Sequence, residues 1–427
     1  MLTALLLLLV QAAATPEGPP SPSPASARIY ERVKASVVTV EVHSGNREAK
    51  SALGSGYVVS AEGTVVTNYH VVESLLAEPE RYELRVRTGA ESLPALVRAF
   101  DVENDLAVLS VPSLHAAPLS MAPALPAPGS PVVALGNPHG LGLSLIEGIF
   151  NGLAAKGAVD RMLLSMPLNS GMSGGPILDT EGRIIGTNVS ILYLSNSLSF
   201  GVPAAKIPAL LAAPRVVLER AALRKEVTRQ LDALEASMVR RAVAPYAASG
   251  GDTARVGGAE TRRPPEVFEC WDDIQVQEQQ GMTKARFGCD LQFTPSIEDV
   301  GPVGMISLLV EHFRFTGGGR YGFYAHLEHH APAHLEVQAQ DPEGGTLSAP
   351  ECVSDRVAAG AHVWKTSSCV SALVEHAGFF NYDLVATTVT HPTVAAFVAV
   401  HMKGVRPASF RIFTERALGS TRLVGTQ

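Results

Sequence analysis

Short apolar runs rich in β-branched residues alternate with Gly, Asn and Pro turns over the first half of the chain. Such runs are typical of strands, and between Ser36 and Ile207 they comprise Val37 to Val42, Val65 to Thr67, Leu84 to Arg87, Leu106 to Val111, Val132 to Leu135 and Arg183 to Ile185. Many short strands separated by turns predict a mainly β fold built from barrels.

The hydrophobic period changes after about Ala204. The apolar residues then recur at spacings of three and four, which is one stripe of an amphipathic helix; they are Leu223, Val227, Leu231, Leu234 and Met238. Charged side chains occupy the other face. We expect a helical connector over residues 211–246 that packs on a neighbouring domain. A coiled coil that forms an oligomer is the alternative.

Two glycine pairs, at 250–251 and 257–258, suggest a flexible linker over residues 247–265. Beyond it, Phe287, Cys289, Leu291 and Phe293 alternate with polar or small residues, which is typical of a strand with one buried face. Further strands are expected at Met305 to Phe315, Arg320 to His330, Asn381 to Thr388 and Thr393 to His401. Residues 266–427 are therefore predicted to form a β-rich, sandwich-like domain, whose function the sequence does not indicate.

All four cysteines fall in this C-terminal region, and three pairings are possible from counting alone. Cys270 and Cys289 flank a turn near residues 280–281 at nearly equal distances, and Cys352 and Cys369 flank Gly360 in the same way. Residues equidistant from a hairpin turn lie opposite each other, within disulfide reach. We therefore predict disulfides Cys270–Cys289 and Cys352–Cys369. A zinc site is less favoured because the close C-x-x-C pairs that such sites use are lacking.

The first residues resemble an export signal. Leu2 to Val10 is apolar except for Thr3, and small residues follow, with a cleavage site expected after Ala14. The run is too short to span a bilayer of about 30 Å as a helix, so we expect no integral membrane segment after cleavage. Residues 15–27, rich in Pro and Ser, are predicted to form a flexible tether. The mature protein is thus expected to be exported, to the periplasm or the exterior.

Composition narrows the class of partner. The chain has 427 residues with a formal net charge of −7, and no block of Lys or Arg occurs. This balance argues against nucleic acid as the main partner. The length accommodates two domains of ordinary size, and no residue pattern calls for a cofactor.

Three segments in a fixed order carry candidate chemistry. His70 follows an apolar strand, Asp105 precedes another, and Ser173 lies in a glycine-rich run, residues 169–176. A serine on a tight turn, beside converging backbone N–H groups, can attack a carbonyl while those groups stabilise the oxyanion. The order His, Asp, Ser is that of the chymotrypsin-type double barrel. We assign the three residues as catalytic, and Gly171 and Ser173 as the donors of the oxyanion hole.

Residues 29 to about 210 resemble the protease domain of the HtrA/Deg group of trypsin-like serine proteases. The strings that carry the resemblance are Gly54 to Val59, Val66 to Val72, Asn104 to Leu109, Ala134 to Pro138, Gly171 to Pro176 and Phe200 to Pro203. The resemblance implies a chymotrypsin-like double β-barrel over residues 28–210 and activity as a serine endopeptidase on polypeptides.

Three features depart from the group's pattern. Met172 stands where Asn usually precedes the nucleophile, and His139 stands where an aromatic residue is common. No PDZ-like sequence follows the protease domain, so regulation of the usual kind is not expected. Met172 contributes its backbone more than its side chain to the loop, so it does not alter the predicted activity.

Specificity is expected to depend on the segments that form the S1 pocket of a trypsin-like fold. The floor would come from Pro167 and Leu168 and the far wall from residues 188–191, namely Asn188, Val189, Ser190 and Ile191. None of them is acidic, and an Arg or Lys side chain left without a carboxylate partner in a pocket is costly. We therefore expect cleavage after small or medium apolar residues.

Histidines cluster at 326, 329, 330 and 334. On a strand, His326, Glu328 and His330 would share a face and could bind a metal. A solvent-facing polar side of a strand is the preferred interpretation, because the group lacks a known ligand spacing; we predict no metal.

Two functional classes follow. The first is an exported serine endopeptidase that works through an acyl-enzyme. The second is a protease-like binding or scaffold protein without turnover that acts through its C-terminal domain. The presence of all three catalytic residue types in suitable local sequence favours the first.

Overall fold

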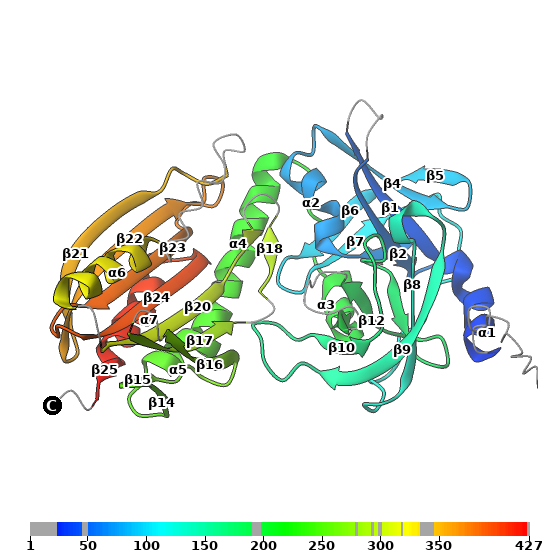
Figure 1. Cartoon of the computed structure of the whole chain (residues 1–427). Helices are drawn as coiled ribbons and strands as arrows, with labels where there is room; N and C mark the ends of the chain where they lie inside the picture. Colours follow the sequence, from blue (N-terminus) through cyan, green and yellow to red (C-terminus); the bar gives the residue numbers. More distant parts are fainter. Residues whose placement is uncertain are drawn as a thin grey trace, which may run out of the picture.

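The computed structural model describes residues 24–44, 50–189, 198–277, 281–291, 294–297, 301–316, 319–333 and 346–424. Two β-rich regions lie on either side of helix α4 (Arg220–Met238), which runs between them (Figure 1). The predicted export signal lies outside the described residues, as does most of the predicted tether. No helix in the described ranges is long and apolar enough to cross a membrane.

The first region contains two β structures. A seven-stranded sheet has the order β5-β4-β1-β2-β3-β7-β6. Its strands are β1 (Val37–Ser44), β2 (Lys50–Val58), β3 (Thr64–Thr67), β4 (Tyr82–Thr88), β5 (Glu91–Pro94), β6 (Leu96–Asp101) and β7 (Leu106–Ser110). Helix α2 (Tyr69–Ala77) follows β3 and buries Val72, Leu75 and Leu76 in the same core as this sheet.

The second structure is a closed barrel of order β10-β13-β12-β11-β8-β9. It is formed by β8 (Pro131–Gly136), β9 (Ser144–Leu153), β10 (Met162–Ser165), β11 (Pro176–Leu178), β12 (Ile184–Val189) and β13 (Leu198–Pro203). The predicted mainly β, chymotrypsin-like class is confirmed: the first half is the seven-stranded sheet and the second half is the closed barrel.

Helix α1 (Pro24–Val33) precedes β1. Its side chains Ile29 and Val33 are buried against residues of both β structures, because they share a core with Val37, Val133 and Leu178. The predicted tether over 15–27 is therefore too long at its C-terminal end, where residues 24–27 already belong to this helix.

The predicted connector helix is present as α4, which continues through a π-helical stretch (Val239–Val243) into α5 (Ala244–Ala247). The Glu219 side chain accepts a hydrogen bond from the Ala221 N–H and so caps the first turn. A short helix, α3 (Ile207–Leu211), and an extended stretch precede it. All five residues of the apolar stripe are buried.

The C-terminal region is built on one seven-stranded antiparallel sheet of order β16-β17-β20-β24-β23-β22-β21. The strands are β16 (Phe268–Gln277), β17 (Met282–Leu291), β20 (Met305–Phe315), β21 (Glu351–Ala359), β22 (His362–Ala372), β23 (Phe380–Thr388) and β24 (Val394–Val405). Two short strands, β18 (Ser296–Ile297) and β19 (Gly301–Pro302), pair with each other nearby.

The expected sandwich is replaced by a sheet whose two faces are covered largely by helices. Helix α6 (Gly319–Ala333) packs Phe323 and Leu327 on one face. The other face is covered by α5, by α7 (Pro407–Ser420) and by a small sheet of β14 (Thr253–Val256), β15 (Ala259–Arg262) and β25 (Arg422–Leu423). The prediction of a β-rich region is confirmed; that of a strand over 320–330 is wrong, because this segment is helical.

The predicted flexible linker over 247–265 is wrong for residues 253–262. Strands β14 and β15 form a hairpin whose residues Ala259 and Thr261 are fully buried. Gly258 is required there by packing, since a Cβ at this position would lie 2.7 Å from Nε2 of His312. Gly257 and Gly258 therefore allow the hairpin to approach β20 closely and do not mark a loose segment.

The cysteine pairs lie as the hairpin symmetry predicts. Cys270 is opposite Cys289 in the β16–β17 register, and Cys352 is opposite Cys369 in the β21–β22 register. The structure joins each pair as a disulfide, with sequence separations of 19 and 17 residues. Each disulfide thus links an edge strand of the large sheet covalently to the neighbouring strand.

One hydrophobic core spans the two regions. It contains residues of the first sheet and α2, the α4 residues Leu223, Val227, Leu231 and Leu234, and four residues of the C-terminal region: Ile297, Val303, Leu373 and Phe379. Since burial of apolar area is the main source of folding free energy, the two regions stabilise each other through this core.

We predict that Leu231→Ala destabilises both regions together, by about 2–5 kcal/mol, because it leaves a cavity in the shared core. Both tryptophans, Trp271 and Trp364, lie in the C-terminal region. Tryptophan fluorescence therefore reports unfolding of that region, while labelling of Ser173 by a fluorophosphonate probe reports the first one. The two signals should be lost at the same temperature, and that temperature should fall in the variant.

The exposed residue Lys225 on the same helix provides the control, since Lys225→Ala removes no buried area. Separate transitions for the two signals, of which only one responds to Leu231→Ala, would show that the regions fold independently.

Candidate active site

His70 lies in the first turn of α2, directly after strand β3. Asn68 precedes this helix in an extended conformation, and its Nδ2 donates to the backbone oxygen of Asp105 at 2.7 Å. The His70 backbone N–H donates to Asp105 Oδ1 at 3.0 Å, and His70 Nδ1 lies 2.8 Å from Asp105 Oδ2. The structure therefore brings two of the predicted catalytic residues into direct contact and fixes the imidazole by one of its nitrogens.

Asp105 is held in an unusual backbone conformation, with φ of 57°. A non-glycine residue in the left-handed region is sparsely populated and persists only where surrounding contacts determine it. The turn before it is fixed by the Asp101 carboxylate, which accepts from the backbone N–H of Asn104 at 3.0 Å and from its Nδ2 at 2.8 Å. The turn aims the Asp105 carboxylate at His70.

The loop that carries Ser173 packs against the segment leading to His70. The Ser55 N–H donates to the Ser173 carbonyl at 2.7 Å, and the Gly174 N–H donates to the Asn188 carbonyl at 3.0 Å. Gly174 has φ of +84°, and a Cβ there would overlap Ser55 O and Thr67 Oγ1 and lie 3.0 Å from the Asn68 N. Only glycine permits this approach, which places the nucleophile loop beside the strand end that presents His70.

The peptide between Ser170 and Gly171 has its orientation fixed by a neighbouring loop. The Ser170 carbonyl accepts from the His139 N–H at 3.1 Å. In a trans peptide the N–H points opposite to the carbonyl, so the Gly171 N–H faces away from His139. Gly171 has φ of +90°, and a Cβ there would lie 2.6 Å from the Asn137 carbonyl oxygen. Glycine at position 171 therefore permits this close approach of the two loops.

Two of the three departures, those at positions 172 and 139, have structural explanations. Met172 is fully buried in the core of the barrel, so its side chain packs inside and leaves the loop backbone in place. His139 adopts φ of +53° in a short 3-10 turn (Pro138–Gly140), and its backbone N–H forms the bond to Ser170 described above. Position 139 therefore acts on the nucleophile loop through its backbone.

Ser55 connects these loops and was not singled out by the sequence analysis. Its Oγ donates to the Gly171 carbonyl at 2.7 Å and accepts from the Asn137 N–H at 2.9 Å. Ser55 is fully buried. A small hydroxyl residue between two glycines, in Gly54–Gly56, was the only sequence signal for this role.

The predicted substrate-binding residues do not all lie as expected. Pro167 is exposed and Leu168 is half-buried against the barrel core, which suits a pocket floor. Asn188 is fully buried, and its Nδ2 donates to the carbonyls of Leu135 and Met172 at 3.2 and 3.4 Å. The Asn188 side chain therefore holds two carbonyls inside the barrel, and its contact with substrate stays a prediction. Val189 is buried at the end of β12, while Ser190 and Ile191 lie outside the described residues.

Charge around the pair favours the protonated form of His70. Burial lowers the pKa of the imidazole, but the Asp105 charge and hydrogen bond raise it by more, so the pKa lies above the ordinary 6.5. A buried guanidinium, Arg161, lies in the field of Asp105, Asp101, Asp160 and Glu103, and its burial lowers its own pKa. Arg161 thus lies among several acidic groups, of which Asp105 is one.

The histidine cluster is arranged differently from the strand that was expected. His326 and His330 lie on one face of α6, with their rings stacked 5.8 Å apart, and His330 Nε2 contacts the buried Glu311. Glu328 lies elsewhere and pairs with Lys365 at 3.4 Å. Over the described residues, no group of three or more His, Cys, Asp or Glu could hold a metal ion.

We predict that labelling of Ser173 by a fluorophosphonate slows as the pH falls, with a midpoint above 6.5. Neutral His70 is the form that can accept the serine proton, and a raised pKa keeps the imidazole protonated up to a higher pH. In Asp105→Asn the midpoint should move to lower pH, and the rate should fall by roughly 10⁴-fold, as in other triads of this kind.

A matched control is Asp160→Asn, because Asp160 is paired with Lys206 at 2.9 Å and does not contact His70. This variant should keep both the midpoint and the rate close to those of the wild type. An unchanged midpoint in Asp105→Asn would contradict the assignment of that carboxylate.

Comparison with known proteins identifies the region that contains this site. Residues 54–186 match the family model described as a trypsin-like peptidase domain. The chain is 31% identical over 199 residues to serine protease HTRA1B of Danio rerio, covering 44% of this chain and 40% of that protein. It is 32% identical over 173 residues to a probable periplasmic serine endoprotease, DegP-like, of Halomonas elongata, covering 37% and 34% of the two chains.

Solved structures of two proteases also align with part of this chain. The active form of the Rv3671c protease of M. tuberculosis aligns with a TM-score of 0.40 at 24% identity, over 49% of this chain and 93% of that one. The serine endoprotease of Yersinia pestis aligns with a TM-score of 0.39 at 27% identity, over 46% and 66%.

The chain spans about two fifths of the length of the curated relatives that it matches. Within that span lie His70, Asp105 and Ser173, in the surroundings described above. The first region of this chain is therefore a trypsin-like serine peptidase domain similar to those of the HtrA/Deg proteins.

Proposed function

We propose that this protein is a serine endopeptidase that hydrolyses polypeptides through an acyl-enzyme. The contact of His70 Nδ1 with Asp105 Oδ2, at 2.8 Å, is the observation that carries the proposal. It leaves Nε2 as the nitrogen able to exchange a proton with Ser173, whose loop packs beside the same strand end. A glycine-rich turn without such a pair nearby would have no base to activate the hydroxyl.

The reaction then takes two steps. Ser173 Oγ attacks the peptide carbonyl while its proton passes to His70 Nε2, and the oxyanion is stabilised by the N–H groups of Gly171 and Ser173. The C–N bond breaks as His70 gives the proton to the leaving amine. Water, deprotonated by His70, then attacks the acyl-enzyme, and Ser173 recovers its proton. Asp105 holds the imidazole and stabilises its charged form throughout.

The substrates we propose are extended or unfolded polypeptides, outside the cytoplasm. The curated relatives are named as proteases, most of them as serine proteases. One is named as periplasmic, one as mitochondrial and one as chloroplastic. The apolar run of residues 2–10 supports export of this chain. Extended substrates are supported by the trypsin-like fold itself, in which the peptide must lie along the nucleophile loop to reach the oxyanion donors.

The proposal is tested by incubating the protein with an unfolded model protein and comparing it with Ser173→Ala and His70→Ala. Each variant should lose nearly all activity while it retains the wild-type melting temperature. The double variant should be little worse than either single one, because these residues act as a unit. Absence of both turnover and probe labelling in the folded wild type would favour the alternative, a binding or scaffold protein of protease fold.

We predict that peptide mapping of the products places Val, Ala or Leu before most cleaved bonds. Pro167 and Leu168 carry no charge, and a buried unpaired Arg or Lys would cost several kcal/mol. Ser173→Ala serves as the control for contaminating proteases. Cleavage mainly after Arg or Lys would show that the S1 pocket contains a carboxylate from a residue other than those predicted to line it.

A further inference from the structure

A glutamine on α4 binds the backbone just before the turn that presents Asp105. Gln230 Nε2 donates to the Phe100 carbonyl at 2.9 Å, and Gln230 Oε1 accepts from the Val102 N–H at 2.8 Å. One side-chain amide therefore satisfies both a donor and an acceptor of the same strand end. Nε2 also donates to Glu226 Oε1, one turn earlier on the helix, at 2.8 Å, which fixes the direction of the amide.

The bonded segment controls where Asp105 lies. Strand β6 ends at Asp101, which pairs with Leu106 at the start of β7. Only residues 102–105 separate the two strands, and Asp105 is the last of them. The Asp101–Asn104 contacts fix this turn from within, and Gln230 fixes it from outside. Because Asp105 has a strained φ of 57°, its position depends on such contacts.

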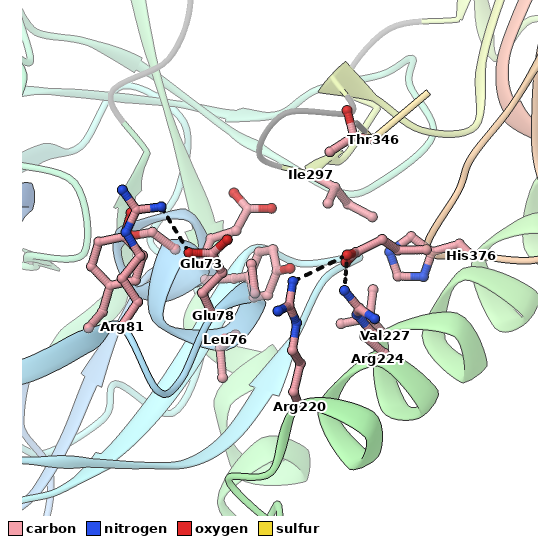
Figure 2. Close-up of a pocket in the computed structure, with 15 residues that line it drawn as sticks. Glu73, Leu76, Glu78, Arg81, Arg220, Arg224, Val227, Ile297, Thr346 and His376 are labelled. Atoms are coloured by element: carbon pink, nitrogen blue, oxygen red, sulfur yellow. Dashed lines mark hydrogen bonds and ion pairs between the residues drawn. The ribbon is translucent and has the colours of Figure 1, made fainter. Parts of the chain in front are cut away.

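The same helix supports the element that carries His70. Leu223, Val227 and Leu231 of α4 share a core with Tyr69, Val72 and Leu76 of α2. Figure 2 shows the polar margin of this contact, where residues of α2 and α4 line one pocket. Helix α4 thus touches the supports of both members of the His70–Asp105 pair.

The C-terminal region holds α4 at several points. Arg220 and Arg224 both form ion pairs with Glu375, and Figure 2 draws these pairs as dashed lines from the two arginines. The Thr228 hydroxyl lies 3.0 Å from His376 Nδ1. Further along, the buried Glu235 carboxylate accepts from the Arg406 N–H at 2.7 Å and from the Ser409 hydroxyl at 2.9 Å. The position of α4 is therefore set by the C-terminal sheet as well as by the protease core.

We propose that Gln230 is a positioning residue for Asp105. The C-terminal region holds α4, and α4 carries Gln230, so the C-terminal region sets the geometry of the His70–Asp105 pair through this side chain. This inference rests on the proposed peptidase function for its kinetic consequences. It assigns the C-terminal region a part in catalysis: a displacement of α4 pulls on the Asp105 turn through two backbone hydrogen bonds. Gln230 touches neither substrate nor the reacting atoms.

The test replaces Gln230 with Met, which has a similar length but removes both hydrogen bonds to the turn. We expect kcat to fall about 10- to 100-fold with KM changed by no more than about twofold, since small misplacements of a catalytic group cost rate rather than binding. The acidic limb of the kcat/KM profile should move to lower pH, because a displaced Asp105 raises the pKa of His70 less. Lys225→Met, on the exposed face of the same helix, should match the wild type.

A second readout does not depend on turnover. The proton on a histidine nitrogen that donates to a carboxylate gives a low-field NMR resonance, and that of His70 should shift or broaden in Gln230→Met and stay unchanged in Lys225→Met. If the wild type hydrolyses no peptide bond, the proposed function fails, and this resonance still decides the positioning role.

Two results would overturn the inference. One is a Gln230→Met variant with the wild-type kcat, pH profile and resonance. The other is a loss of activity that equals the fraction of unfolded molecules. In that case the activity per folded molecule, the acidic limb of the pH profile and the resonance would all be unchanged. Gln230 would then stabilise the fold without positioning Asp105.

Discussion

The buried stripe of α4 is the contact on which the arrangement of this protein depends. Its residues Leu223 to Leu234 lie in one core with the first β-sheet, with α2 and with apolar residues of the C-terminal region. Burial of large side chains contributes about 1.5–3 kcal/mol each, and native proteins are stable by only about 5–15 kcal/mol in total. Loss of this core would thus cost a large part of the stability, so neither region is expected to move freely against the other.

Close backbone packing is the second constraint, and it acts at the nucleophile loop. Gly171 and Gly174 both have positive φ, and side chains at either would overlap the backbone or side chains of neighbouring loops. The loop is therefore held by hydrogen bonds from Ser55, Asn188 and His139. These contacts fix the loop backbone, and under the proposed function they orient its N–H groups before substrate arrives.

The sequence predicted those parts of the molecule in which one local signal dominates. The spacing of the apolar residues in α4 predicted a helix, which is present. The symmetry of the cysteines about two hairpin turns predicted the pairing Cys270–Cys289 and Cys352–Cys369, which the structure has. The candidate triad was predictable because its residues lie in strings whose order and spacing are specific. His70 and Asp105 meet as expected, although a distance between side chains cannot be read from spacing.

The failures occurred where a local pattern is ambiguous. In α6, Phe323 and Leu327 fit both a period of two and a period near four, and the helix is favoured because they pack together on Phe313 and Phe397 of the sheet. In β14–β15, glycines read as flexible are in fact required by the nearby His312 ring. Both outcomes depend on residues distant in sequence, so no single-segment pattern could have revealed them.

The C-terminal region contacts the first region at a second place besides the α4 core. The Gly157 N–H donates to the Val267 carbonyl at 3.1 Å, and Arg241, just after α4, donates to the Gly157 carbonyl at 3.1 Å. These contacts hold the loop that leads to the buried Arg161, a cation in the field of Asp105. Away from water, the Coulomb energy between two charges such as Arg161 and Asp105 changes steeply with the distance between them. A shift of the C-terminal region would thus alter both the placement of Asp105, through α4, and the electrostatic environment of its carboxylate, through this loop.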